Sequence, residues 1–357
     1  MTKMKSRERV ESVLKGNPID RPPIAFWGHH YDVEYSLAGH VSSALWWQRY
    51  LDLDILKVQC RASYHGEDWG LRLSYPEAQP FVGVDHGYLP PEPPADKPQL
   101  VTPAVSSLKD WGQLHPLKPT LGALGERLAA LEAIKAGLER MGQDPLVIET
   151  VFNPISIAAR LVGCGGGQRR EILLKHMREQ PDVIHGALQV ITSTFRDYVR
   201  AVLKTGIDGI FFATTDWASY DLLTADEYAE FGRQYDLQVL EAMQDGLIVF
   251  HVCNQNNMLL ELGDYPVDVF SWAPSDPGNP TLSQVQQNLS GKGVMGGISN
   301  AALSESVPAN ALAEAQAAYN ETNGKGWICA PNCSVWPTSP VNNMLAVSDY
   351  VRSLGKP

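Results

Sequence analysis

Two residues that could bind a metal ion stand two positions apart at the end of one apolar run. His251 and Cys253 close the segment 247–253 (LIVFHVC). On a β-strand, residues i and i+2 point to the same face, so the imidazole and the thiolate would converge on one point. A second thiolate from another strand end would complete a three-ligand zinc site whose fourth position stays open for water or substrate.

Two later cysteines are candidates for that second thiolate. Cys333 directly follows the apolar run 326–332, and Cys329 lies inside it. Cysteine is among the most buried residue types, so Cys329 could equally be a core residue, and the H-x-C pair could be inert packing. The residues alone therefore leave a metal or reactive site and inert packing as alternatives. Cys60 and Cys164 are interpreted as structural.

Carboxylates and histidines near other apolar runs could carry acid–base chemistry. Asp216, Glu149 and His29 are the candidate catalytic residues, because a histidine and a carboxylate in one site can act as general base and general acid. Asp216 could equally cap the following helix. Glu149 lies inside an apolar strand. If it faces the inside of the barrel, it is expected to be functional, because burying a carboxylate without a partner costs free energy. If it faces outward, it is expected to be a solvated residue near the rim. Glu149 is also a candidate fourth zinc ligand, and a metal-free lyase or hydrolase is a further hypothesis.

Residues at the ends of several runs are candidates for substrate contacts. Aromatic side chains there could form an apolar pocket that stacks against a small or aromatic substrate, or could pack beneath loops. The candidate substrate-binding residues are His30, Trp27, Trp217, Tyr220, Asn254, Trp272 and Asn300. For His29 and His30 the alternative is structural hydrogen bonding, and Trp46 and Trp47 are expected on a helix face.

Eight short apolar runs are the elements that would position these residues. They are 22–30, 54–60, 145–152, 206–214, 247–253, 267–273, 293–299 and 326–332. Segments of helical composition lie before or between them: 6–15, 169–179, 182–204, 225–245, 282–289 and 309–323. Near-continuous apolar strands alternating with helices indicate a parallel sheet buried on both faces. Eight such units predict an α/β fold, a (β/α)8 TIM barrel with an N-terminal helix, and a site at the carboxyl ends of the strands.

The whole chain, 1–357, is predicted to form a single barrel domain. Segment 75–119, between the second and third runs, is rich in proline (PEAQP, YLPPEPPADKP) and predicts an irregular cap or excursion. It lacks the apolar periodicity that a separate core would need. No G-x-G-x-x-G follows a strand, so a dinucleotide site is not indicated, and the glycines of 163–167 are interpreted as a helix-ending loop.

Composition narrows the class of protein. The 357 residues are 44% hydrophobic and 19% charged, which is ordinary for a globular enzyme. The formal net charge is −11 without any block of Lys and Arg, which argues against a nucleic-acid or anionic-membrane partner. The N-terminus is charged and helical, unlike a signal peptide, and no apolar run could span a bilayer. Five scattered cysteines indicate reduced thiols and a cytoplasmic location.

Four segments in order resemble the uroporphyrinogen decarboxylase superfamily over most of the chain. SRERVESVLKGNPIDRPPIAFWG is similar to that family's N-terminal helix and its entry to the first strand. GIDGIFFATTDWASYDLLTADEYAEFGRQYD is similar to its strand-four segment, VFHVCNQNN to its strand-five motif, and APNCSVWPTSPVNNMLAV to its strand-eight motif. The combination is specific, although no single segment would be.

The resemblance offers two activities. True decarboxylases of the superfamily hold carboxylated porphyrinogens with arginines just after strand one and use an aspartate beyond strand two. Here the corresponding segment reads WGHHYDVEYS, with no arginine between Arg21 and Arg49, and Asp54 opens its strand instead of ending it. Uncompensated substrate carboxylates would be costly in such a site. A decarboxylase-type lyase is therefore the second hypothesis.

The other branch contains zinc methyltransferases that move a methyl group from a corrinoid protein to a thiol such as coenzyme M. The resemblance implies His251, Cys253 and Cys333 (in PNC) as zinc ligands, which favours Cys333 over Cys329. Asn254 and Asn332 stand where the branch has glycines. The expected activity is zinc-dependent methyl or alkyl transfer to a thiol. No D-x-H-x-x-G corrinoid motif is present, so a corrinoid would arrive on a partner protein or free. A homo-oligomer is a further expectation.

Overall fold

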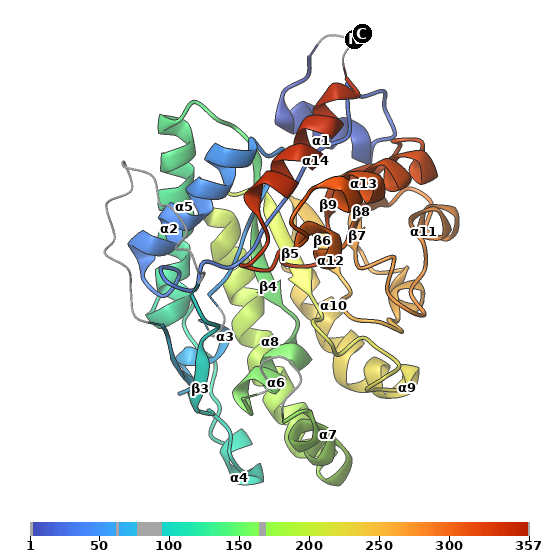
Figure 1. Ribbon diagram of the computed structural model, residues 1–357. Helices are drawn as coiled ribbons and strands as arrows, with labels where there is room; N and C mark the ends of the chain where they lie inside the picture. The colour runs from blue at the N-terminus through green and yellow to red at the C-terminus, as the bar shows by residue number, and fades with distance from the viewer. Residues whose placement is uncertain (1–2, 62–63, 77–94, 164–168, 356–357) are drawn as a thin grey trace.

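The computed structural model describes residues 3–61, 64–76, 95–163 and 169–355, and it has an α/β fold. Seven parallel strands form one sheet in the order β1-β4-β5-β6-β7-β8-β9, and the sheet curls into a half-barrel consistent with a TIM-like barrel (Figure 1). Its strands are β1 Ile55–Val58, β4 Leu146–Phe152, β5 Gly209–Ala213, β6 Leu247–His251, β7 Val269–Ser271, β8 Gly293–Ile298 and β9 Trp327–Pro331. Each of them falls within one of the predicted apolar runs.

The first predicted run, 22–30, lies between the two edges of this sheet. Ile24 forms an isolated parallel bridge with Cys329 of β9, and the Ala25 amide donates to the Cys329 carbonyl at 2.9 Å. On the other side, the Asp54 amide, just before β1, donates to the Ile24 carbonyl at 2.9 Å. This segment therefore contacts both β9 and β1, although its own residues are not assigned as a strand.

Helices cover the outer face of the sheet (Figure 1). The longer ones are α1 Ser6–Leu14, α2 Leu37–Leu51, α5 Gly122–Arg140, α6 Pro154–Leu161, α7 Arg170–Glu179, α8 Pro181–Lys204, α13 Ala309–Thr322 and α14 Val341–Ser353. The shorter ones are α3 Tyr64–Glu67, α4 Leu108–Trp111, α9 Ala225–Tyr228, α10 Gln234–Leu240, α11 Leu282–Asn288 and α12 Asn300–Leu303, with a 3₁₀ turn at Leu259–Leu262. Trp46 and Trp47 lie on α2, as expected, and both are buried.

The helix expected over 225–245 is interrupted. A π-helical turn, Ala229–Arg233, separates α9 from α10. The extra residue of a π-turn rotates the following helix relative to the preceding one, which brings Tyr228 and Asp236 onto one face. The Tyr228 hydroxyl donates to Asp236 Oδ2 at 2.7 Å, and the Tyr265 hydroxyl donates to the same oxygen at 3.0 Å. The predicted helix therefore forms over 225–240 with a π-helical turn inside it, and it ends earlier than expected.

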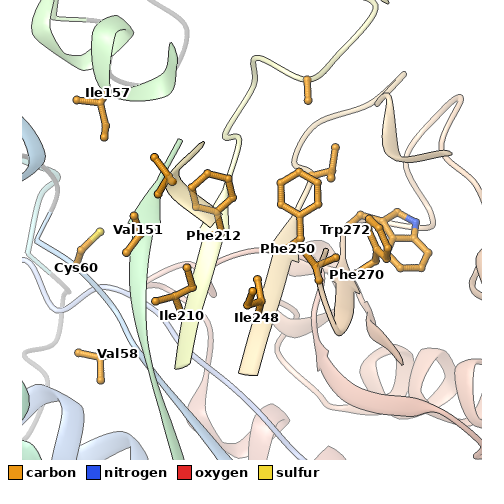
Figure 2. Packing of buried hydrophobic residues seen from close by; sticks show 14 of the residues in the cluster. Val58, Cys60, Val151, Ile157, Ile210, Phe212, Ile248, Phe250, Phe270 and Trp272 are labelled. Carbon is orange, nitrogen blue, oxygen red and sulfur yellow. The ribbon is translucent and has the colours of Figure 1, made fainter. Parts of the chain in front are cut away.

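Side chains alternate between two hydrophobic layers. Ile148 of β4 and Phe211 of β5 belong to the cluster on the inner face of the curled sheet, which Val10 and Val13 of α1 close at the amino ends of the strands. Their neighbours Val151 and Phe212 belong to the larger cluster between the sheet and the helices (Figure 2). Both faces of the sheet are therefore buried, as near-continuous apolar strands require.

The insertion between β1 and β4 carries a small antiparallel pair, β2 Arg72–Ser74 and β3 Gln99–Thr102. Of the segment predicted as an irregular cap, 75–119, residues 77–94 lie outside the described residues, as do Cys164 and the glycines 165–167. The remainder of the segment holds β3 and α4. No helix in the described part of the chain is long and apolar enough to cross a bilayer.

Candidate metal centre

His251, Cys253 and Cys333 come together at the carboxyl ends of β6 and β9. One ligand atom from each lies within 4.8 Å of the others, and the Sγ atoms of Cys253 and Cys333 are 3.7 Å apart. His251 is the last residue of β6, on its inner face with Phe211 stacked beside it at 5.1 Å between ring centroids. Cys253 repeats the orientation of His251 two residues later, as the i, i+2 spacing predicts.

The separation of the two sulfurs suits a tetrahedral metal ion. Zinc–thiolate bonds are about 2.3 Å long, so a tetrahedral angle at zinc places two sulfurs about 3.8 Å apart. The observed 3.7 Å agrees with that value, and a disulfide would need about 2.0 Å. Two sulfurs and one imidazole nitrogen are a donor set typical of zinc. The three residues therefore fit the ion that the sequence predicts.

Cys329 is not part of this group. It lies inside β9 on the outer face of the sheet, where it belongs to the cluster between sheet and helices. Complete burial raises the pKa of its thiol above the ordinary value. Of the two cysteines that the sequence left as alternatives, Cys333 is the one beside His251 and Cys253.

A neighbouring strand orients the imidazole. His251 Nδ1 is 3.0 Å from the hydroxyl oxygen of Ser271, the last residue of β7. A histidine that binds a metal through one ring nitrogen usually donates its other N–H to such a partner. With Nδ1 directed at Ser271, Nε2 is the nitrogen available to a metal ion. Ser271 could not be predicted from the sequence, because it carries no signal except its position at a strand end.

The two thiols are electrostatically unequal. The hydrogen bond from the Cys253 thiol holds the pKa of Cys333 well below its ordinary value, against the opposing effect of burial, and His251 lowers it further. The same hydrogen bond, together with burial, raises the pKa of Cys253. The opposite shifts describe one coupled pair, joined by a hydrogen bond whose proton lies between the two sulfurs. A cation between them would release that proton, because thiolates are the ligands of zinc.

Two of the predicted catalytic residues, Asp216 and His29, lie beyond the carboxyl ends of the strands, and both have hydrogen-bond or ion-pair partners there. Asp216, after β5, pairs with Arg170 at the start of α7, and its negative charge contributes to the raised pKa of Cys253. His29 Nδ1 lies 2.9 Å from Glu34 Oε2, and its Nε2 lies 2.7 Å from Gln59 Nε2. Asp216 caps no helix; its carboxylate is 27% exposed.

The third, Glu149, does not face the site. It is 0% exposed, and the alternation along β4 turns it to the outer face of the sheet. There it accepts hydrogen bonds from Arg127 of α5, at 2.5 and 3.1 Å, and from the Tyr198 hydroxyl of α8 at 2.9 Å. The expectation of an inward functional carboxylate or a solvated rim residue is wrong on both counts. Glu149 joins helices to the sheet through a buried ion pair.

The predicted substrate-binding residues are divided between the two faces. His30 and Trp272 point away from the site: His30 bonds Ser43 of α2 at 2.7 Å, and Trp272 lies in the outer cluster (Figure 2), where its indole N–H donates to the Pro280 carbonyl at 2.8 Å. Trp217 is buried in that cluster as well. For these three residues the packing alternative holds. Burial lowers the pKa of His30 to about 3, so it stays neutral.

The other predicted contacts lie on the inner face or at the rim. Trp27 is buried in the inner cluster. Asn300, at the start of α12, donates from Nδ2 to the Ser334 carbonyl at 3.0 Å, beside Cys333, and its Oδ1 is buried without a hydrogen-bond partner in the described structure. Tyr220 is 50% exposed.

Lys57 is a charged residue of the inner face that the sequence analysis did not identify. It lies two residues after Ile55 on the same face of β1 and is 4% exposed. Its Nζ lies 4.7 Å from the ring centroid of Phe211 and 5.4 Å from that of Trp27, and it donates to Gln59 Oε1. The available signal was a lysine inside the apolar run DILKVQC.

Comparison with known proteins identifies the family of the chain that carries this site. The family model described as uroporphyrinogen decarboxylase (URO-D) matches residues 91–354. The chain belongs to the URO-D family. The methylcobamide:CoM methyltransferase MtbA of Methanosarcina mazei is 23% identical over 271 residues, 74% of either chain. MtaA of Methanosarcina barkeri, also a methylcobamide:CoM methyltransferase, is 26% identical over 228 residues, 61% of either chain.

Solved structures show the same fold. A methyltransferase from Methanosarcina mazei superposes with a TM-score of 0.75 at 18% identity, covering 98% of this chain and 99% of that one.

A uroporphyrinogen decarboxylase of Campylobacter curvus is also related by sequence: it is 27% identical over 106 residues, 30% of either chain. The relatives of this URO-D family member are enzymes, and those matched over most of its length are methyltransferases.

Asn254 and Asn332 keep structural roles in this URO-D family member. Asn254 has φ +76°, a left-handed conformation that glycine adopts freely and asparagine tolerates better than other residues. Asn332 accepts the Gly297 amide at 2.8 Å and donates to the Ser275 hydroxyl at 3.2 Å. Asn332 thus ties β8 and the loop after β7 to the segment that carries Cys333.

The residues weighed for decarboxylation lie at the opposite end of the sheet. Asp54 precedes β1 and accepts from Arg9 at 2.5 Å and from Arg21 at 2.6 Å. Both arginines are therefore committed to a buried ion cluster at the amino ends of the strands, away from His251. The structure thus adds no support for a decarboxylase site.

Proposed function

We propose that this protein is a zinc-dependent methyl- or alkyltransferase that delivers its alkyl group to a thiol acceptor. The observation that carries the proposal is the convergence of His251, Cys253 and Cys333, with the two sulfurs 3.7 Å apart, close to the separation expected across a tetrahedral ion. His251 Nε2 and the two thiolates would hold the ion, leaving its fourth position for the acceptor. Glu149 is excluded as fourth ligand by its place on the outer face of β4.

The residues present account for the roles that such a reaction needs. Zinc, when bound, lowers the pKa of a coordinated thiol so that the acceptor reacts as a thiolate near neutral pH. Ser271 fixes the ring of His251, and Asn332 and Asn300 anchor the loop beside Cys333. The acceptor thiolate attacks the alkyl carbon in one step: the S–C bond forms while the bond from that carbon to the donor breaks, and the donor leaves with the electron pair. The protein cysteines therefore remain ligands and form no covalent intermediate.

The related MtbA and MtaA proteins suggest the donor. Both are named methylcobamide:CoM methyltransferases, so we propose a methylated corrinoid as donor, carried by a partner protein or free, and a small thiol as acceptor. Asp216 with Arg170, and His29 with Glu34, would lie around the entrance that the donor approaches.

We further propose that residues 1–357 form one closed (β/α)8 domain, with segment 22–28 as its eighth strand between β9 and β1 and segment 75–119 as a cap. The hydrogen bonds of Ile24 and Ala25 to both sheet edges support the closure. A cytoplasmic location, with reduced thiols, fits the proposed chemistry; a homo-oligomer stays a prediction.

Metal analysis of purified protein tests this proposal. We expect about one zinc ion per chain, lost in C253S and in C333S, and retained in the matched control C329S, whose sulfur lies on the outer face of β9. Zinc-loaded protein should also alkylate a thiol with methylcobalamin. If the wild-type protein contains no metal after growth with added zinc, or if all variants contain the same amount of zinc per chain, the assignment is refuted.

A further inference from the structure

The loop after β7, residues 273–280, joins the two segments that carry the cysteine ligands. Hydrogen bonds tie it on one side to the segment after β6, which carries Cys253, and on the other side to the segment after β9, which carries Cys333. The strands β6 and β9 are not neighbours, because β7 and β8 lie between them in the sheet. The pairing of β6 with β9 therefore cannot set the distance between the two sulfurs, and contacts made by the loops must contribute to it.

Asn279 makes the link to the Cys253 segment. Its Nδ2 donates to the carbonyls of Asn254 and Ala273, both at 2.9 Å. Its Oδ1 accepts the Asn257 amide at 3.0 Å. One side chain thus uses both of its N–H donors and its carbonyl oxygen on the backbone of two loops. An aspartate of the same size would keep the acceptor and place an oxygen against both carbonyls.

The residue that Asn279 holds is the one that directs the sulfur of Cys253. The Asn254 amide donates to that sulfur, and Asn254 has the left-handed φ of +76°. A residue other than glycine keeps such a conformation only where its surroundings fix it. The bond from Asn279 to the Asn254 carbonyl supplies that constraint, so it also fixes the amide that points at the sulfur.

Asn332 makes the corresponding link to the Cys333 segment. Its Oδ1 accepts the Gly297 amide of β8 at 2.8 Å, and its Nδ2 donates to the Ser275 hydroxyl of the loop at 3.2 Å. Asn332 is 5% exposed and directly precedes Cys333, whose sulfur accepts the Ser334 amide. A glycine, which the sequence resemblance leads one to expect at this position, has no side chain that could make either bond.

We infer that Asn279 and Asn332 are positioning residues of the candidate metal centre. Through the loop 273–280 they hold the sulfurs of Cys253 and Cys333 at the separation that suits a tetrahedral ion, and this separation does not depend on the ion. The inference rests on the proposed function and adds two residues that touch neither the ion nor a substrate. It gives this chain a site that is organised before metal binds.

Cross-linking of the two thiols in metal-free protein tests the inference without metal or turnover. Dibromobimane fluoresces after both of its arms have alkylated neighbouring thiols, and monobromobimane, which alkylates single thiols, corrects for their reactivity. We expect the ratio of the two rates to fall roughly tenfold in N279D and in N332G, the size expected when two hydrogen bonds are lost. C253S should give no cross-link. Equal ratios in wild type and both variants would overturn the inference.

N343A is the matched control. Asn343 is also buried, and its Nδ2 also donates to two carbonyls, those of Leu303 at 3.0 Å and Glu305 at 2.7 Å. Neither of these residues neighbours a ligand in the chain. N343A should therefore keep the cross-linking ratio of the wild type even if its stability falls. A ratio that falls equally in N343A would show that general loosening, and not the two asparagines, separates the sulfurs, which also overturns the inference.

Zinc affinity is the second measurement. We expect N279D and N332G to bind zinc roughly 10–100-fold more weakly than the wild type, the range typical for lost partners of metal ligands. N279D adds a carboxylate, which by charge alone would favour a cation, so weaker binding in this variant reports lost geometry. If zinc affinity falls while the cross-linking ratio is unchanged, the asparagines do not act on the sulfur separation and the inference is wrong.

Two outcomes separate this inference from the proposed function. If cross-linking depends on both asparagines and the wild type binds no zinc, the positioning role stands and the zinc-dependent transfer falls. If the wild type binds zinc and alkylates a thiol while neither variant changes the cross-linking ratio, the inference fails alone. Should N279D not fold, N332G carries the test, because it removes the link on the other side of the loop.

Discussion

His251 Nδ1 faces the Ser271 hydroxyl at 3.0 Å, so the strand next to β6 sets the orientation of the imidazole in the candidate metal centre. Removing the hydroxyl in S271A should leave the three ligands in place and weaken zinc binding roughly 10–100-fold. Competition with a chromogenic chelator measures this. S348A is the matched control, because Ser348 is a buried serine on α14 whose hydroxyl has no partner in the described structure. Equal affinities would show that Ser271 does not orient the ring.

Asn254 should tolerate glycine better than alanine. Its φ of +76° favours residues without a Cβ, so N254G should keep the stability of the wild type, whereas N254A should lose about 1 kcal/mol. Urea unfolding measures both. The order should reverse at Asn320, inside α13, where glycine costs about 1 kcal/mol relative to alanine. The same order at both positions would contradict the role of the left-handed turn.

Glu149 should affect stability and leave metal binding intact. E149Q leaves the Arg127 guanidinium buried without its counter-charge, which should cost roughly 3–5 kcal/mol of unfolding free energy. The folded fraction should still bind zinc with the wild-type stoichiometry. D264N, which breaks the largely exposed pair Arg233–Asp264, should change stability by less than about 1 kcal/mol. A stable E149Q protein without zinc would instead restore Glu149 to the site.

Asp236 should make stability fall as pH rises from about 4 to 7. Burial raises its pKa to about 7, against the hydrogen bonds from Tyr228, Tyr265 and Asn153. In that range the folded state keeps a proton that the unfolded chain releases at its ordinary pKa near 4, so raising the pH favours unfolding. The decline relative to D236N should be on the order of a few kcal/mol, measured by urea unfolding at several pH values. Parallel pH profiles for both proteins would disprove it.

Much of the frame could be predicted from the sequence, because parallel strands buried on both faces leave continuous apolar runs. All seven strands of the sheet lie in such runs. The helix α5, Gly122–Arg140, was not identified, because glycines and alanines weaken its amphipathic pattern. The run 22–30 was expected as a strand, yet it forms only isolated parallel bridges, Ile24 with Cys329 and Gly28 with Val335.

The candidate site could be predicted only in part. The strand period placed His251 and Cys253 side by side, but it could not say which face of β4 carries Glu149, because both faces of that strand are buried. Nor could it find Ser271 or Lys57, whose importance comes from contacts with other strands. His30 and Trp272 were predicted to contact substrate, but imidazole and aromatic side chains pack equally well against helices. In the structure both lie on the outer side of the sheet.

The ligands of the candidate centre come from the end of β6 and from the segment after β9, with Cys333 lying 80 residues after Cys253. During synthesis, His251 and Cys253 would emerge long before Cys333, and the site would be complete only after β9 has docked on β8. A metal ion bound there would stabilise the finished sheet and no shorter intermediate that lacks its last strand. Metal occupancy in the cell would thus report how much of the newly made protein has completed its fold.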